Sequence, residues 1–313
     1  MNLATAVLNE RLVLSSILSV SLLNAAVGGT TYNWKTSGAY GANGNWQTPS
    51  DWGVQSGYPG SADTASLPRG LYTITSSDDI SVDTLSLAVF GAAAQVNPIL
   101  NLGGRSFTCA KQVALRGVPA TGYSTGANYC NLQLLNGTFD FTGGVFPGGV
   151  IGYANCSGGF TVGAGAVLNA NVSYWNAGSR VIIRDGGVWN TTANIIMGDR
   201  TCLDSYGCIV VTGKGSLLSL KTETGSRGLY IRGNRAGLYV TDGGLVTNCV
   251  NVYVGRASTK ANCTGTAASD DTFIELNNGR VYAVTDVNFG WTEAVKCYPR
   301  LQIRGGILRA EVG

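Results

Sequence analysis

The most informative chemical feature of this sequence is an absence: its 313 residues include no histidine. Histidine is the usual base for a serine or cysteine nucleophile and the commonest zinc ligand. The chain therefore holds neither Ser-His-Asp nor Cys-His catalysis of its own. A Gly-x-Ser-x-Gly match at 122–126 lies in a loop rich in glycine, serine and threonine. We interpret it as chance, because no histidine is available as its base.

Tyrosine, tryptophan and arginine recur at one kind of position, one or two residues after a glycine that closes a short β-rich run. If these glycines mark equivalent corners, the side chains line up along one edge of the molecule. Aromatic rings and guanidinium groups together suit an anionic glycan. We therefore predict a glycan-contact edge; the alternative is a row of ordinary exposed corners, because the column is chemically mixed. The predicted edge comprises Tyr153, Arg200, Arg235, Arg256 and Trp291.

Eight cysteines form the next group, and none of them belongs to a Cys-x-x-Cys motif. Several lie in connections between the β-rich runs, where loops of neighbouring units approach each other. In an exported protein such cysteines are candidates for disulfides. We predict Cys202–Cys208 first, because it encloses a short loop, and then Cys130–Cys156 and Cys263–Cys297. The alternative is a set of reduced thiols that pack as small apolar residues.

A recurring strand–turn–strand pattern must position all of these residues. Its clearest copy is 237–257, GLYVTDGGLVTNCVNVYVGRA, where short β-branched and aromatic runs are separated by glycine, asparagine and aspartate. Further copies begin at Arg180, Cys208, Thr272 and Arg300. One turn glycine marks each copy, at intervals of 22 to 35 residues: Gly137, Gly165, Gly187, Gly215, Gly244, Gly279 and Gly306.

Repeats of this length, built from short strands, predict a solenoid. One unit cannot bury its own apolar face, but stacked units can, because each coil covers the next. We predict an all-β solenoid of about eight coils, with glycine where the corner needs positive φ or lacks room for a Cβ. The alternative is a β-sandwich or barrel with glycine-rich turns, which has no reason to repeat a sequence pattern. The 45 glycines and the charged fraction of 12% fit many corners and many buried strand faces.

Charge and acidic residues limit the function classes. The net charge of +3 gives no general attraction to nucleic acid. A lyase or glycosidase needs carboxylates, or a basic residue with bound calcium, that converge on one face. Here Asp78-Asp79 and Asp270-Asp271 are adjacent pairs in loop-like contexts, and Asp185 and Asp242 occupy turns. We therefore predict no catalytic residue, no cofactor and no metal ion.

Both ends of the chain differ from the repeats. An apolar run of twelve residues, 12–23, follows Arg11 and ends in small residues, which predicts a secretory signal peptide at 1–29, cleaved near Ala26 or Gly28. The run is short for a transmembrane helix, so we predict no membrane span in the mature part. The alternatives are a helix that covers the end of the solenoid and an arbitrary start within a longer gene. The chain stops at Gly313 inside a repeat, without a polar cap, so we expect further sequence beyond it.

Residues 30–70 hold aromatic residues in a regular frame: Trp34, Gly44-Asn45-Trp46 and Asp51-Trp52, then Tyr58-Pro59-Gly60 and Asp63-Thr64-Ala65. This motif, with the β-rich runs 71–75 and 80–87 after it, resembles the N-terminal part of bacterial autotransporter-type passenger proteins and of related secreted β-helix repeat proteins. The resemblance covers residues 30–105 best. It implies a right-handed parallel β-helix presented outside the cell. Because the first coil of a solenoid is open at its end, we expect Trp34, Trp46 and Trp52 to cover it; the alternative is an aromatic sugar-binding platform.

The sequence thus predicts three parts: a signal peptide at 1–29, an N-terminal aromatic cap at 30–70 and β-solenoid repeats at 71–313. We expect a non-enzymatic protein, exported to the extracellular space or outer cell surface, with an adhesive or structural role. Its expected partners are an extracellular glycan or other surface proteins. A polysaccharide-binding or polysaccharide-degrading protein is the alternative, because parallel β-helices often carry lyases and glycosidases.

Overall fold

The computed structural model describes residues 29–37, 40–88, 96–116, 129–147, 157–172, 180–197, 208–220, 228–231, 236–255, 272–289 and 299–310. Within these ranges the chain forms 24 β-strands and one short 3-10 helix, η1 (Pro49–Trp52). Apart from Gly29, the predicted signal peptide lies outside the described residues. No helix in the described part of the chain has the length and apolarity needed to cross a membrane.

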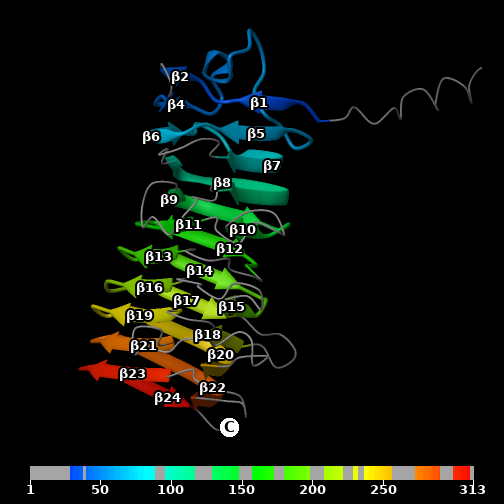
Figure 1. Ribbon diagram of the computed structural model, residues 1–313. Coiled ribbons are helices and arrows are strands. Elements are labelled where there is room, and N and C mark those ends of the chain that lie inside the picture. Colours follow the sequence, from blue (N-terminus) through cyan, green and yellow to red (C-terminus); the bar gives the residue numbers. More distant parts are fainter. Residues whose placement is uncertain are drawn as a thin grey trace, which may run out of the picture.

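The strands stack into a rod, and each coil pairs in parallel with the coils before and after it (Figure 1). Three ladders of paired strands run along the rod, and we name them the first, second and third sheet in the order in which a coil visits them. Several long strands turn a corner and contribute to more than one sheet. Two short strands, β2 (Thr36–Ser37) and β3 (Tyr40–Gly41), form a separate antiparallel pair.

The first sheet begins where β4 (Gly44–Asn45) pairs with β6. It then joins β6 (Gly70–Thr75), the start of β8 (Val96–Arg116), the start of β9 (Tyr129–Phe141), β11 (Ser157–Val162), β13 (Arg180–Arg184), β16 (Cys208–Thr212), β19 (Gly237–Thr241), β21 (Thr272–Asn277) and β23 (Pro299–Arg304). From β6 to β23 these are nine rungs, against the eight or so that the repeat predicts. The parallel β-helix expected from the sequence is confirmed.

The other two sheets follow the same order along the rod. The second joins β7 (Ile80–Ala88), the middle of β8, the end of β9, β12 (Ala166–Ala170), β14 (Val188–Thr191), β17 (Leu217–Leu220), β20 (Leu245–Val254), β22 (Arg280–Phe289) and β24 (Ile307–Ala310). The third contains β1 (Thr31–Asn33), β5 (Thr64–Leu67), the ends of β7 and β8, and β10 (Val145–Pro147). Further along the rod it contains β15 (Ile195–Met197), β18 (Gly228–Ile231) and the ends of β20 and β22.

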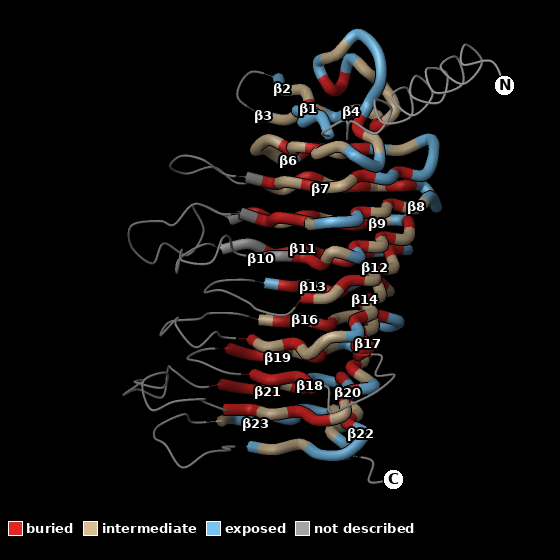
Figure 2. Tube along the Cα trace, turned by 90° about the vertical axis from the view of Figure 1, so that its right-hand side faces the viewer, coloured by how far each residue is buried: buried red, intermediate tan, exposed pale blue. Residues whose placement is uncertain are grey.

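Buried residues alternate with less buried ones along most strands (Figure 2), and the buried side chains form the core of the rod. In the first sheet Val181 and Ile183 are fully buried, and the register places Ile209 and Val211 next to them in the following rung. Parallel in-register pairing repeats this arrangement, so that apolar residues form inward-facing columns. The buried residues make one cluster that runs from Trp34 to Ala283.

The turn between the first and second sheets uses two neighbouring positions for different physical reasons. The earlier position has positive φ in each rung from β9 to β23, with Asn136, Gly165, Gly186, Gly215, Gly243, Asn278 and Gly305. At the later position a Cβ on Gly244 would lie closer than 3.0 Å to the backbone of the previous coil. Its register equivalents are Gly137, Ala166, Gly187, Ser216, Gly279 and Gly306.

This register corrects the alignment of turn glycines that the sequence suggested. Gly165 and Gly215 belong to the earlier, positive-φ position, and Ala166 and Ser216 occupy the later one. The repeat looked regular because glycine satisfies either requirement, and sequence spacing does not tell the two apart.

The tryptophans of the N-terminal region lie at the end of the core. Trp34, Trp46 and Trp52 are at most 2% exposed, and their rings pack edge to face with centroids 4.7 to 4.8 Å apart. Trp46 continues this contact to Phe107 at 5.2 Å. Rings buried to this extent offer no free face to a sugar, so these three side chains do not form the alternative sugar-binding platform.

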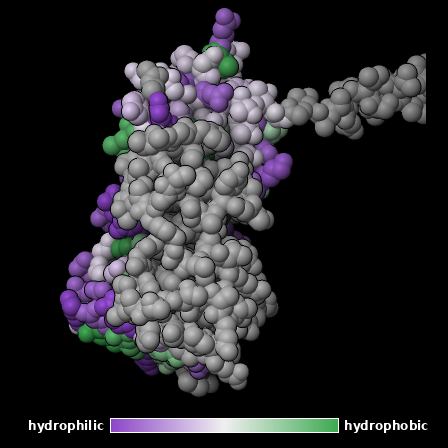
Figure 3. Space-filling view, viewed as in Figure 1, coloured by the Kyte–Doolittle hydropathy of each residue, from purple (hydrophilic) through white to green (hydrophobic). Residues whose placement is uncertain are grey.

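The opposite end of the described rod exposes apolar side chains. The register places Leu301 and Ile303 of β23 beside the fully buried Ile274 and Leu276, yet they are 41% and 46% exposed. Hydrophobic atoms gather over β23 in the space-filling view (Figure 3). These side chains occupy core positions of the last described rung.

Candidate ligand-contact face

The glycan-contact edge predicted from the sequence lies outside the described residues. This applies to all five of its members, Tyr153, Arg200, Arg235, Arg256 and Trp291. The structure therefore neither brings them together nor separates them, and the edge stays a prediction.

The described cysteines are Cys109, Cys130, Cys208 and Cys249, and all four are free thiols. Cys130 is fully buried, and burial raises the pKa of its thiol well above the usual range. Its surroundings are those of a small apolar residue in the core. The free thiols of Cys130 and Cys208 give no support to the predicted Cys130–Cys156 and Cys202–Cys208 bridges. Their partners, and the whole Cys263–Cys297 pair, lie outside the described residues, so the pairings stay predictions.

The outer face of the first sheet, from β13 to β23, brings together side chains with binding chemistry. Four exposed arginines stand at its corners: Arg180 and Arg184 on β13, and Arg300 and Arg304 on β23. We call the part of this face that the four residues enclose the arginine frame. Four rung steps separate β13 from β23, so the frame is about 19 Å tall, and four residues along a strand make it about 13 Å wide.

One column of the frame holds Arg180, Cys208, Gly237, Phe273 and Arg300 in register. Gly237 makes room in this column, because a Cβ there would collide with the Phe273 ring. The Arg300 guanidinium lies 5.3 Å from the centroid of the same ring, within cation–π range. Phe273 is therefore held between a glycine and an arginine.

The central column of the frame contains Tyr239, and the register places Glu275 beside it in the next rung. The Tyr239 and Phe273 rings meet edge to face, with centroids 4.8 Å apart and planes at 70°. Burial raises the pKa of the Tyr239 hydroxyl, and Cys208 and Glu275 raise it further, whereas Arg300 and Arg180 lower it. Charges of both signs therefore act on one phenol at the centre of the face.

The carboxylates of the described chain do not form an acid–base pair on this face. Asp185 and Asp242 sit at exposed turns with positive φ, and Asp242 accepts hydrogen bonds from Thr212 and Thr241. Asp140 accepts a hydrogen bond from Asn169 in a polar ladder on the second sheet. No group of three His, Cys, Asp or Glu side chains within the described ranges is arranged to hold a metal ion.

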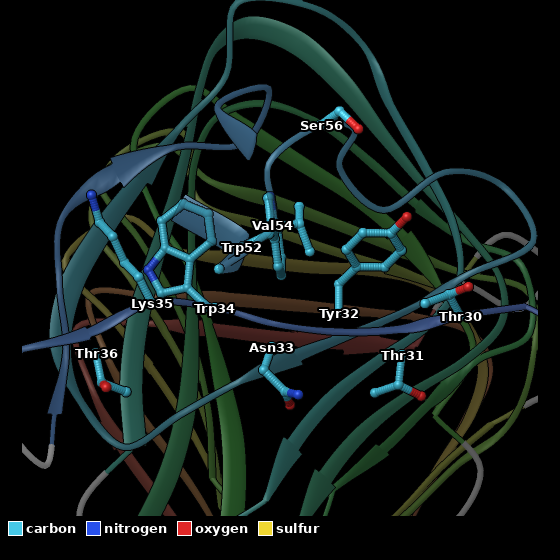
Figure 4. A pocket seen from close by; sticks show the side chains of 11 residues that line it. Thr30, Thr31, Tyr32, Asn33, Trp34, Lys35, Thr36, Trp52, Val54 and Ser56 are labelled. Atoms are coloured by element: carbon cyan, nitrogen blue, oxygen red, sulfur yellow. The ribbon is translucent and has the colours of Figure 1, made fainter. Parts of the chain in front are cut away.

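A separate hollow lies at the N-terminal end of the rod. It is an open hollow of about 640 Å³ over β1 (Figure 4). Tyr32 and Trp34 lie on the same side of β1, with Trp52 and Val54 between them. Lys35, also in its wall, forms an ion pair of 2.6 Å with the buried Asp51. Both indoles are only 2% exposed, and the Lys35 cation is already paired with Asp51.

Sequence reasoning missed the arginine frame, although a signal for it exists. RVIIR at 180–184 and RLQIR at 300–304 both begin and end with arginine. Positions i and i+4 of a strand point to the same side of the sheet. With the inward residues at 181 and 183 assigned to the core, both arginines of RVIIR must face outward. Only the register between the coils shows that these two strands lie on either side of the same aromatic residues.

In comparisons with known proteins, no family model, no curated protein and no solved structure matched this chain.

Proposed function

We propose that this protein is a non-enzymatic rod with an adhesive or structural role. The observation that carries the proposal is the single apolar cluster from Trp34 to Ala283. A core shared by all the coils makes the described chain one elongated body, because each coil covers the apolar face of its neighbours. Such a body holds its outer faces at fixed distances from one another, which suits a spacer or a binding surface.

The outer faces support a binding role more than a chemical one. Glycoside hydrolysis uses two carboxylates about 5–10 Å apart on either side of the scissile bond. Among the described residues, Glu275 is the one carboxylate inside the arginine frame, and its neighbours in the register are Tyr239 and Gln302. A polysaccharide-degrading activity is the alternative that the experiment below must exclude.

We also propose that the protein is exported and is displayed outside the cell, as autotransporter-type passengers are. The support is the apolar run at 12–23, which resembles a signal peptide, and the tryptophan motif of residues 30–70. Mass spectrometry of the protein from its own cells tests this directly. A mature N-terminus near Ala26 or Gly28 is expected, and an intact Met1 would contradict export by this route.

The functional test uses the full chain and a panel of polysaccharides: polygalacturonate, alginate, xylan and dextran. We expect retention on at least one immobilised polysaccharide, without new reducing ends and without unsaturated uronate products after long incubation. Chain shortening of any member of the panel would overturn the non-enzymatic role.

A further inference from the structure

The arginine frame is a cationic region with an aromatic centre. Its four arginines enclose one carboxylate, Glu275, and the turn that borders the face adds Asp185, which lies 3.5 Å from Arg184, together with Lys214 and Asp242. Five positive and three negative charges leave an excess of two positive charges on a face about 19 by 13 Å. All four arginines are exposed, and the Arg300 guanidinium also lies over the Phe273 ring.

The chemistry of the frame matches an acidic sugar chain. Guanidinium groups bind carboxylate and sulfate with paired, charge-assisted hydrogen bonds. The apolar C–H face of a sugar ring packs on an aromatic ring, and the half-buried Tyr239 supplies such a ring, with the buried Phe273 supporting it edge to face. The Tyr239 hydroxyl and the Glu275 carboxylate lie between the arginines and can hydrogen-bond sugar hydroxyl groups.

The carboxylate at the centre distinguishes a sugar chain from DNA. The sugar–phosphate backbone within a DNA strand has no hydroxyl donor to offer Glu275, and its phosphates repel that side chain. A polysaccharide has hydroxyl donors on every ring and places its acidic groups at intervals. We infer that the outer face of the first sheet between β13 and β23 binds an acidic polysaccharide, with its acidic groups on the arginines and a sugar ring on Tyr239.

This inference rests on the proposed adhesive role and names its ligand class. The frame spans about 19 Å along the rod, so it accommodates a segment of several sugar units. Carboxylated and sulfated polysaccharides share the anionic chemistry that the arginines recognise, and separate probes distinguish them.

The test measures binding of the full chain to immobilised polygalacturonate, dextran sulfate and uncharged dextran, with single-stranded DNA as a second polyanion. Wild-type protein is expected to bind at least one acidic polysaccharide and not dextran. The double variant Arg180→Ser/Arg300→Ser is expected to lose affinity by about tenfold or more, as two charge-assisted hydrogen bonds disappear. Tyr239→Ala is expected to weaken binding by a smaller factor, because the arginines remain.

The matched control is Arg280→Ser/Arg309→Ser, which removes the same charge from the second sheet at the same end of the rod. We expect this variant to bind like the wild type. Equal losses of affinity in both double variants would show general charge attraction and overturn the site. Unchanged binding by Arg180→Ser/Arg300→Ser would also overturn it, and so would tighter binding of the wild type to DNA than to any polysaccharide. Unfolding midpoints check that every variant is folded. The variant Arg180→Lys/Arg300→Lys keeps the charge but loses the guanidinium fork, so it separates the contribution of charge from that of the paired hydrogen bonds.

Failure of the inference is distinct from failure of the proposed function. A protein that binds only uncharged dextran, or no polysaccharide at all, contradicts the frame as an acidic-glycan site. The non-enzymatic role depends instead on the product assay with the same polysaccharides.

Discussion

Gly244 has no room for a side chain, because its Cβ would lie closer than 3.0 Å to the backbone carbonyl oxygen of Val211 in the preceding coil. A Cβ on the neighbouring Gly243 would meet Lys214 only at an ordinary contact distance of 3.5 Å, but the φ of Gly243 is 86°. Two adjacent glycines in one turn therefore serve different needs, one steric and one conformational.

Replacing Gly244 with alanine is expected to lower the free energy of unfolding by about 1–3 kcal/mol, because the backbone of two coils must move apart. Gly243→Asn is the matched control, since Asn136 and Asn278 occupy the equivalent position with positive φ. We expect it to change stability by less than about 1 kcal/mol. Urea unfolding of both variants provides the comparison. A Gly244→Ala protein as stable as the wild type would contradict the assigned register.

Trp189 is the large side chain at the middle of the core. It is fully buried, its ring centroid lies 5.2 Å from that of Phe160, and its Nε1 donates a hydrogen bond of 3.0 Å to the carbonyl oxygen of Ala170. Trp189→Ala is expected to cost about 3–5 kcal/mol through the cavity it leaves. Trp189→Phe retains most of the packing and is expected to cost about 1–3 kcal/mol, mainly through the unpaired carbonyl. Equal costs for the two substitutions would argue against a packed core at this rung.

The ion pair between Lys35 and Asp51 fixes the N-terminal region. Asp51 is buried, and its second carboxylate oxygen accepts a hydrogen bond from the backbone N–H of Asn45. Lys35→Met leaves this carboxylate without its cation and is expected to cost about 1–2 kcal/mol. The exposed pair of Lys111 with Asp83 gives the control, because Lys111→Met is expected to change stability by less than about 0.5 kcal/mol. Thermal unfolding in which Lys111→Met loses more stability than Lys35→Met would contradict the structural role of the Lys35–Asp51 pair.

The buried thiol of Cys249 makes the stability of the protein depend on pH in the alkaline range. Burial raises the pKa of its thiol from the ordinary value of 9.0 to about 12. The unfolded chain therefore loses this proton at a lower pH than the folded chain does. Stability from this group is complete below pH 9.0 and decreases as the pH rises from there to about 12.

The slope expected from this one group is about 1.4 kcal/mol per pH unit, because one proton separates the two states. Other buried thiols and tyrosines add their own slopes, so the measured quantity is the difference between wild type and Cys249→Ala. The variant is expected to lose stability less steeply between pH 9.0 and about 12. Parallel curves for the two proteins would show that the thiol is accessible to solvent.

Much of the fold follows from local sequence. Alternation in stretches such as RVIIR and GLYVT gives strands with one buried side, and repeated glycines show where each coil turns. Those properties depend only on residues that are neighbours in the chain. The one-residue error at Gly165 and Gly215 arises because positive φ and close approach both select glycine. In the structure, Trp46 of the tryptophan cluster also packs against Phe107, a contact that the spacing of these residues in the sequence does not predict.

The sequence by itself determined that the chain is a stack of strand–turn–strand units with inward apolar columns, because the period of the pattern fixes which side of each strand is buried. Only the tertiary structure decided which outward side chains become neighbours. Tyr239 meets Phe273, and Arg180 shares a column with Arg300, across coils of unequal length. The physical reason is that register between coils is set by backbone hydrogen bonds and by contacts such as Gly244 on Val211, while the loops absorb the differences in length.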